Sequence, residues 1–497
     1  MTGPATAPGR GRPFGDWTPS RGGTDLPPAD LAPADSRRAD RFRSRCPHPE
    51  VTCPNRFDPY WDALWGRSSS LSWMTADTVD AQQRAGLVSM SRRMSRPGSE
   101  ARRLALKPEG WQRRLRLLGA AGFWRTLSAE QAAAVTGDLT VLDFERQVPF
   151  TLYRAGLIDV GAFNGVLRQS KYPQPRTVVY RPSNTTVFDK HLAPHLTWPE
   201  WVSVTGGRPW SAASQFDRHN LLAAELGLRL QEYADDVGAV VGENLSTIDL
   251  LAGSGLGRAL PDADNRAADL TLIRNDGLRV AVEITATTTG TFKSKVERWC
   301  RLLADLPLED SGLVVVFVVA DPVERHGAGG KATRAAAGTI INQMTRRYPG
   351  WVGNRVAERI GIADWREWFP GRHQLSGNFL DLRCLTPSGP PDALWQEHRW
   401  LARDPGTGGF ATGFDPARDR ADFTAVIDNV QSLVGVPHWA RDPERGVRMW
   451  QVMIAERGHD HFPIPVSARP DRLKGPGFGV PAGAASAPLP PARLRGL

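Results

Sequence analysis

The sequence has little cysteine, no long apolar run and no hydrophobic segment at its N-terminus. Four cysteines in 497 residues are too few for a disulfide framework, so we expect reduced thiols and a reducing compartment. No stretch approaches the roughly 20 consecutive apolar residues of a membrane helix, and residues 1–17 lack the apolar core of a signal peptide. These absences exclude a disulfide-rich secreted domain and predict a cytoplasmic protein with no membrane partner.

Acidic residues are in the minority, and the formal net charge is +9 at pH 7. Through Arg116 the chain carries 20 Lys and Arg against 12 Asp and Glu, so most of the basic excess lies in this N-terminal part. Basic side chains neutralise phosphates whatever the base sequence, which makes nucleic acid the first partner to consider. The Arg-, Ala- and Gly-rich usage of a GC-rich genome is the alternative source of the excess.

Composition divides the chain into five parts. The first 40 residues combine Pro, Gly, Asp and Arg with almost no β-branched or aromatic residues, so they bury too little apolar surface to fold. The following stretch has three tryptophans and an Arg-rich run with Arg92 and Arg93, and we expect it to fold only against later domains or on DNA. Residues 1–105 are therefore predicted to be a largely disordered basic arm that binds DNA. Residues 351–465 are a C-terminal extension of unassigned role, and the Pro/Gly-rich tail 466–497 is predicted to be disordered.

The part between the arm and the extension begins with two short predicted helices in residues 106–200. Trp111 and Leu115 belong to an apolar series at helical spacing, with arginines on the other side. Ser128 can cap a second helix, which Gly137 ends. Both are short amphipathic helices with an apolar side suited to a shared core.

A third helix, predicted over residues 140–159, carries candidate DNA contacts. Its apolar stripe leaves Arg146, Gln147 and Arg154 elsewhere on the helix surface. Pro149 removes a backbone hydrogen bond inside this helix, so the helix is either kinked or begins later than its periodicity suggests.

A hairpin is predicted after the third helix. Residues 177–183 alternate apolar and polar side chains like a strand, and residues 186–192 are a second short segment. Three helices followed by a hairpin are the order of a winged helix-turn-helix, whose third helix enters the major groove of double-stranded DNA. We therefore predict a winged helix-turn-helix DNA-binding domain over residues 106–200, with a protein–protein adaptor as the alternative.

Residues 210–350 alternate between helical and strand patterns and predict an α/β domain. The apolar run of residues 312–321 has the composition of a central strand. An Asn-Asp-Gly turn at residues 275–277 predicts a hairpin with strands at 268–274 and 278–286. The other elements expected are helices over residues 214–236, 291–306 and 331–348 and a strand over residues 237–245.

The predicted hairpin carries two carboxylates that could hold a metal ion. Asp269 is near the start of one strand and Glu283 is in the middle of its partner, so together they could bind Mg²⁺, with Glu225 as a third ligand. An Asp followed by Glu-x-Lys resembles the PD-(D/E)XK nucleases, but Thr285 stands where that family has its lysine. The alternative is that the two carboxylates are ordinary strand residues bonded to neighbouring helices.

Two lysines on the following helix, Lys293 and Lys295, are the candidates to replace the missing basic group. We therefore name Asp269, Glu283 and these lysines as candidate catalytic residues. No other cofactor is expected. The Cys46, His48 and Cys53 group lacks the paired spacing of a zinc site, and the glycine-rich stretch of residues 326–333 lacks the spacing of a phosphate-binding loop.

The order of these features resembles the replication-relaxation family over about residues 110–305. The resemblance rests on the winged-helix pattern, the triplet Arg218-His219-Asn220, the pair Asp269 and Glu283, and the lysine-bearing helix. It implies a protein of plasmids or integrative elements, notably of actinobacteria, that pairs a winged helix with a degenerate PD-(D/E)XK-like domain. It also implies a role in replication, relaxation or transfer, with other plasmid replication or transfer proteins as partners.

Three functions follow from the sequence. The preferred hypothesis is a DNA-binding protein of a mobile element whose nuclease-like domain does not cut. The second is an active Mg²⁺-dependent DNA endonuclease. The third is a non-catalytic assembly factor that uses its winged helix to bind protein.

Overall fold

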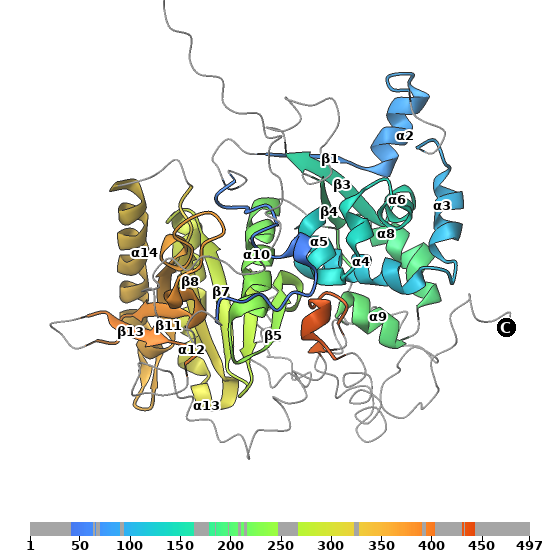
Figure 1. The fold of residues 1–497 in the computed structure, drawn as a ribbon. Helices are drawn as coiled ribbons and strands as arrows, with labels where there is room; N and C mark the ends of the chain where they lie inside the picture. The colour runs from blue at the N-terminus through green and yellow to red at the C-terminus, as the bar shows by residue number, and fades with distance from the viewer. Residues whose placement is uncertain are drawn as a thin grey trace, which may run out of the picture.

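The computed structural model shows a mixed α/β protein with several sheets, the largest of which has seven strands. Figure 1 shows a four-stranded sheet with its helices lying beside the part that contains this large sheet. The predicted disorder of residues 1–40 and 466–497 lies outside the described residues, as do Arg92 and Arg93. The structure describes residues 41–62, 65, 70–89, 94–163, 178–183, 185–196, 198–206, 210–212, 216–246, 267–322, 328–389, 394–402, 430–431 and 433–442.

Three helices and a four-stranded sheet form the first part. The helices are α4 (Trp111–Trp124), α5 (Ala129–Thr136) and α6 (Gln147–Arg154), and the sheet has the order β1-β3-β4-β2. Strands β3 (Ile158–Phe163) and β4 (Val178–Pro182) form an antiparallel hairpin. Strand β2 (Leu127–Ser128) pairs with β4, and β1 (Leu71–Met74) pairs with β3.

Capping and proline set the limits of α5 and α6. Ser128 and Gln131 form a reciprocal capping box with both bonds at 3.1 Å, and Gly137 ends α5 with a φ of 70°. The predicted third helix is divided into the 3-10 helix η2 (Leu139–Leu142) and α6. Pro149 lies in the first turn of α6, where its missing N–H breaks no intrahelical bond. Of the two outcomes expected from this proline, the later helix start is observed.

The partner of β4 differs from the prediction. Residues 186–192 lie in α8 (Thr185–Val187) and the π-helical segment η4 (Phe188–Leu192), not in a strand. The hairpin partner of β4 is β3, whose first residues the sequence pattern assigned to the third helix. Gly156 has a φ of 76°, which ends the helical path and lets the chain leave as a strand. The true hairpin therefore comes earlier in the chain than predicted.

Residues 41–105 are folded wherever they are described, which corrects the prediction of a largely disordered arm over residues 1–105. They contain η1 (Pro49–Val51), α2 (Ala76–Arg84) and α3 (Gly98–Ala105) in addition to β1. Cys53 and Tyr60 are fully buried. Their contacts are with later parts of the chain, which explains why local composition did not reveal the fold.

The seven-stranded sheet has the order β13-β12-β11-β8-β7-β6-β5. Its central strand is β8, as the valine run predicts, and the structure shows it parallel to both β7 and β11. Strands β5, β6 and β7 form an antiparallel meander, and Gly277 with a φ of 94° completes the predicted turn between β6 and β7. The strands are β5 (Val237–Gly242), β6 (Leu270–Arg274), β7 (Arg279–Thr285), β8 (Leu313–Val319), β11 (Ile360–Asp364), β12 (Arg383–Thr386) and β13 (Gln396–Arg399). The last three strands come from the predicted C-terminal extension, which therefore widens this sheet.

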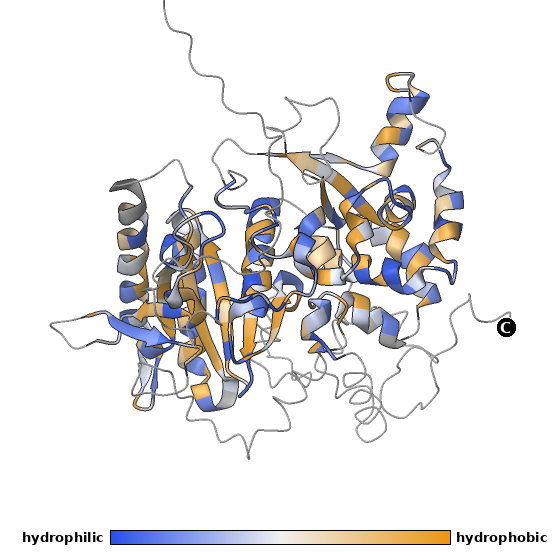
Figure 2. Ribbon diagram, viewed as in Figure 1, coloured by the Kyte–Doolittle hydropathy of each residue, from blue (hydrophilic) through white to orange (hydrophobic). Residues whose placement is uncertain are grey.

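Helices cover both faces of the large sheet, and alternate residues of its strands face each layer. Val280 and Val282 belong to the buried cluster on the side of α10 (Asp217–Tyr233). Ala281 and Phe317 belong to the cluster on the side of α12 (Gly290–Asp305) and α14 (Ala328–Arg347). Figure 2 shows the apolar residues concentrated on the strands and on the inner sides of these helices.

One buried core continues from the small sheet into the large one. Leu118 of α4, Leu222 of α10 and Val316 of β8 belong to the same cluster. Gly227 of α10 permits this contact, because a Cβ there would collide with the ring of Trp124. The four cysteines are free and buried, and none of the helices in the described ranges is long and apolar enough to cross a membrane. The remaining short elements are η5 (Ala193–His195), α9 (Trp198–Thr205), η6 (Glu243–Leu245), α13 (Leu308–Ser311), β9 (Gly350–Trp351), β10 (Asn354–Arg355), η8 (Val356–Glu358), α15 (Trp365–Trp368), α16 (Gly377–Leu380) and η10 (His438–Ala440).

Candidate functional site

The two predicted catalytic carboxylates lie on neighbouring strands of the large sheet. Asp269 directly precedes β6, and its backbone N–H donates to the carbonyl of Val282 at 3.0 Å. Its Oδ2 accepts a hydrogen bond from the N–H of Ile284 at 2.6 Å. The two bonds go to the residues directly before and after Glu283 in β7, and they therefore fix Asp269 beside Glu283. The structure therefore brings this pair together.

Helix α12 supplies the groups that neutralise Glu283. Lys295 Nζ lies 2.6 Å from Glu283 Oε2, and the indole N–H of Trp299 donates to Oε1, also at 2.6 Å. Arg298 Nη2 lies 3.7 Å from the same Oε1. Glu283 itself is 0% exposed, so its charge is balanced by these neighbours and not by water. The site thus contains a buried carboxylate with both oxygens hydrogen-bonded.

Helical geometry separates the two lysines that the sequence named. Lys295 and Trp299 are four residues apart and lie on one side of α12, facing the sheet. Lys293 is exposed, and its charge acts on Glu297, on another side of the helix. Only Lys295 therefore reaches the carboxylate pair.

A third acidic side chain, Glu243 of η6, is close enough to interact with the pair. Burial raises the pKa of Glu243, and the charges of Asp269 and Glu283 add to this rise. Burial also raises the pKa of Glu283 and that of Asp269, while Lys295 opposes both shifts. Burial alone would lower the pKa of Lys295, but Glu283 and Asp269 outweigh it and raise this pKa above its ordinary value. Three carboxylates thus interact with the ammonium group of Lys295, whose side chain is 32% exposed.

Helix α10 and the N-terminal segment close one side of this site. Burial and the charge of Lys295 lower the pKa of His219 to about 4, so the imidazole is neutral at pH 7. Trp65 packs edge-on against His219 with ring centroids 4.8 Å apart. The indole N–H of Trp65 donates to the carbonyl of Ala320, after the end of β8, at 2.5 Å. The aromatic ring therefore connects α10 to the central strand.

Thr285 supplies no charge at the position where the nuclease resemblance has a lysine. Its hydroxyl donates to the carbonyl of Thr287 at 2.8 Å, which turns it back onto the loop after β7. The positive charge beside Glu283 comes instead from Lys295, ten residues further along the chain.

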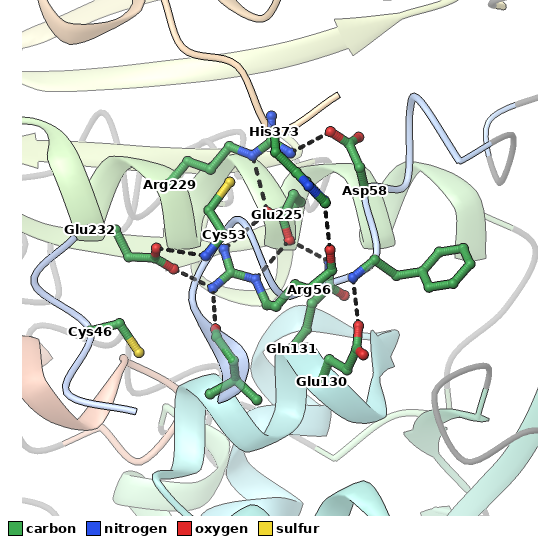
Figure 3. A network of polar contacts seen from close by, with 12 residues as sticks. Cys46, Cys53, Arg56, Asp58, Glu130, Gln131, Glu225, Arg229, Glu232 and His373 are labelled. Atoms are coloured by element: carbon green, nitrogen blue, oxygen red, sulfur yellow. Dashed lines mark hydrogen bonds and ion pairs between the residues drawn. The ribbon is translucent and has the colours of Figure 1, made fainter. Parts of the chain in front are cut away.

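Glu225 is not part of this site, which corrects its prediction as a third metal ligand. It is fully buried, and both of its oxygens accept from guanidinium groups (Figure 3). Arg56 Nη2 and Arg229 Nε each lie 3.0 Å from Oε1, and Arg56 Nε lies 3.1 Å from Oε2. Its charge is therefore used to pair two buried arginines.

The same network ties the N-terminal segment to three other parts of the chain. Arg229 also donates to Asp58 at 2.8 Å, and Arg56 also donates to Glu232. The side chain of Glu130 in α5 accepts from the N–H of Phe57 at 2.5 Å. Figure 3 shows these groups converging with His373, whose ring bonds to the carbonyl of Arg56 at 2.9 Å. We call Arg56, Asp58, Glu225, Arg229 and Glu232 the arginine network.

The acidic residues near Lys295 do not fit a divalent cation as they lie. Mg²⁺ takes about six oxygen ligands in near-octahedral geometry. Here both oxygens of Glu283 already accept hydrogen bonds, and so does Oδ2 of Asp269. Over the described ranges, no group of three or more His, Cys, Asp or Glu side chains is arranged to hold a metal ion. The ammonium group of Lys295 supplies, beside Glu283, the positive charge that a bound cation would otherwise supply.

The predicted DNA contacts on α6 are divided between surface and interior. Arg146 and Gln147 are exposed at the start of the helix. Arg154 is buried, which corrects its prediction as a DNA contact. Its Nη2 donates to Asp80 of α2 at 2.8 Å and to the carbonyl of Arg96 at 2.6 Å. This arginine therefore fastens Asp80 and Arg96 onto α6.

Sequence reasoning missed Trp299, Glu243 and the packing role of His219. Trp299 could have been found from its four-residue spacing to Lys295, because residues so spaced share one side of a helix. Glu243 gave no such signal, since its approach to Asp269 depends on how β5 pairs with β6. Comparisons with family models, with curated proteins and with solved structures found no match to this chain.

Proposed function

We propose that this chain is a DNA-binding protein in which a winged helix-turn-helix adjoins a nuclease-like domain that does not cut DNA. The first half of the proposal is supported by the order α4, β2, α5, α6, β3, β4, with β2 paired to β4. Helix-strand-helix-helix-hairpin is the arrangement expected of winged-helix DNA-binding units. Double-stranded DNA is therefore the proposed partner.

The second half is supported by the order of elements around the carboxylates. Helix α10, the meander β5-β6-β7, helix α12 and strand β8 follow each other as in the PD-(D/E)XK pattern, with Asp269 before the second strand and Glu283 in the third. The contact of Lys295 with Glu283 carries the proposal of an inactive site. It neutralises the carboxylate that a metal ion would need, so the domain is proposed to bind or assemble rather than cut.

The resemblance to the replication-relaxation family supplies the biological setting of this proposal. A protein of a plasmid or integrative element would use such an architecture in replication, relaxation or transfer, together with other proteins of that process. The reaction itself is not assigned to this chain.

A gel-shift assay and a plasmid-nicking assay test the proposal together. At about 50 mM salt the purified chain should shift a random-sequence duplex at micromolar concentration, and the shift should weaken steeply with added salt. Supercoiled plasmid with Mg²⁺ should stay intact with the wild type and with Glu283→Gln alike. A wild type that fails to shift duplex at this salt concentration would contradict the DNA-binding proposal.

One observation favours a second function, a Mg²⁺-dependent endonuclease. Lys295 brings to Glu283 the positive charge that Thr285 cannot supply, and such charge stabilises a phosphodiester transition state. Nicking that requires Mg²⁺, that Glu283→Gln abolishes and that the exposed control Glu358→Gln retains would establish this function and overturn the inactive reading.

A further inference from the structure

Helix α3 covers the helix that a winged-helix protein normally inserts into the major groove. Ala101 and Ala105, on one side of α3, are buried, and a Cβ on Gly98 would lie 3.5 Å from the carbonyl of Arg154 at the end of α6. From Val148 to Arg154 every residue of α6 is buried. In this conformation α6 offers DNA only its first turn, at Arg146 and Gln147.

Basic side chains lie near the end of α6, where α3 covers it. Arg102 of α3 is half-buried and folds back toward Gly98 of its own helix, while Lys190 and His191 are exposed on η4. The two segments meet around the end of α6, where Gly98 approaches Arg154 and a Cβ on Gly156 would lie 3.7 Å from Val187. Figure 1 shows α3, α6 and α8 together at this end of the molecule.

The acidic residues on the same two elements are Glu100 of α3, which pairs with Arg96 at 3.6 Å, and Asp189 of η4. No ion pair of Arg102 or Lys190 is seen in the described ranges, and Arg102 Nε bonds to the carbonyl of Gly98 in its own helix, at 3.2 Å. Burial and the charges of Arg102 and Lys190 lower the pKa of His191. Like charges at close range repel, and an anion placed among them relieves the repulsion.

We propose that Arg102, Lys190 and His191 bind the sugar–phosphate backbone of double-stranded DNA, and that α3 thereby replaces most of α6 as the DNA-contacting helix. The proposal rests on the DNA-binding function above and names the surface that performs it. A neutral imidazole can donate one hydrogen bond to a phosphate oxygen, while the arginine and lysine supply the charge. Binding through this cluster is independent of base sequence, because phosphates carry no sequence information.

The salt dependence of binding measures these contacts directly. Each phosphate contact contributes about 0.9 to the slope of log affinity against log salt concentration. The double variant Arg102→Ala/Lys190→Ala should therefore lower the slope by about 2 and the affinity at about 0.1 M salt by at least about tenfold. The charge-preserving variant Arg102→Lys/Lys190→Arg should retain most of the wild-type slope.

A matched control distinguishes the effect of losing this surface from the effect of losing positive charge anywhere on the protein. Arg346→Ala/Arg355→Ala removes the same charge from two exposed residues on the large-sheet part and should leave the slope unchanged. If the wild type does not bind duplex at all, the proposed function fails. If it binds with a steep salt dependence that Arg102→Ala/Lys190→Ala leaves intact, DNA binding stands and the assignment of this surface is wrong.

Discussion

Glu225→Gln should destabilise the folded protein strongly, because it removes one of the carboxylates that balance two fully buried arginines. Arg56 and Arg229 are each within 3.0 Å of Glu225, and all three side chains are 0% exposed. Removing one partner of a buried ion pair costs about 3–5 kcal/mol, since the remaining charge has no solvent to stabilise it. Asp58 and Glu232 remain in the arginine network, so the loss should stay within this range and not exceed it.

Urea unfolding followed by tryptophan fluorescence measures this change, since the chain has 17 tryptophans. The expected loss is a large fraction of the roughly 5–15 kcal/mol by which folded domains are stable. Glu358→Gln is the matched control, because Glu358 is 47% exposed and pairs with Arg355 only across one helical turn. The control should change the unfolding free energy by less than about 0.5 kcal/mol.

Two results would refute this reasoning. A loss below about 1 kcal/mol would mean that the two arginines are solvated or paired elsewhere. A stabilisation of the wild type by Mg²⁺ that Glu225→Gln abolishes would return Glu225 to the role of a metal ligand. Neither result is compatible with an arginine network that uses both oxygens of this carboxylate.

Two further predictions concern α10. As the pH falls from 6.5 toward the folded-state pKa of about 4, the unfolded state protonates His219 first, so stability present above pH 6.5 is lost. Burial also lowers the pKa of His373 and of His438 to about 4, so the figure of about 2 kcal/mol between pH 7 and pH 5 is the share of His219 alone. It is measured as the difference between the wild type and His219→Gln, and an equal pH dependence of the two would show that the imidazole is not buried. Gly227→Ala should cost about 1–3 kcal/mol, because its new methyl group meets the ring of Trp124. The control Gly290→Ala meets no atom within 4 Å and should be neutral or slightly stabilising in thermal unfolding, and equal effects of the two would contradict the predicted collision.

Local patterns predicted four of the seven strands of the large sheet, β5 to β8, because the determinants of these four are local. The valine run of β8 and the turn at Gly277 specify a central strand and a hairpin with little help from distant residues. The hairpin in turn places Asp269 beside Glu283, so the pairing of these two carboxylates could be predicted from a turn and a register. Lys295 could be named as a candidate because it lies on the helix predicted directly after this hairpin.

The rest of the candidate sites depends on contacts that no local pattern encodes. Glu225 among the apolar core positions of its helix looked like a functional carboxylate, but its partner Arg56 lies 169 residues earlier. The segment that contains Arg56 has too few apolar residues to fold alone and is ordered by later parts of the chain. Strand β3 was missed for a different reason, because the apolar residues after Gly156 fit the end of a helix as well as the start of a strand.

The burial of arginine changes what the positive net charge implies about DNA binding. Among the described residues, seven arginines are at most 4% exposed, so their guanidinium groups lie inside the protein and do not contribute to a phosphate-binding surface. They are Arg56, Arg114, Arg154, Arg229, Arg274, Arg279 and Arg359. A count of basic residues therefore overstates the charge available to DNA. What matters is where cations near the surface form no ion pair, and Arg102 of α3 and Lys190 of η4 form none in the described ranges. Any affinity for DNA should accordingly depend on a few residues there more than on the total of +9.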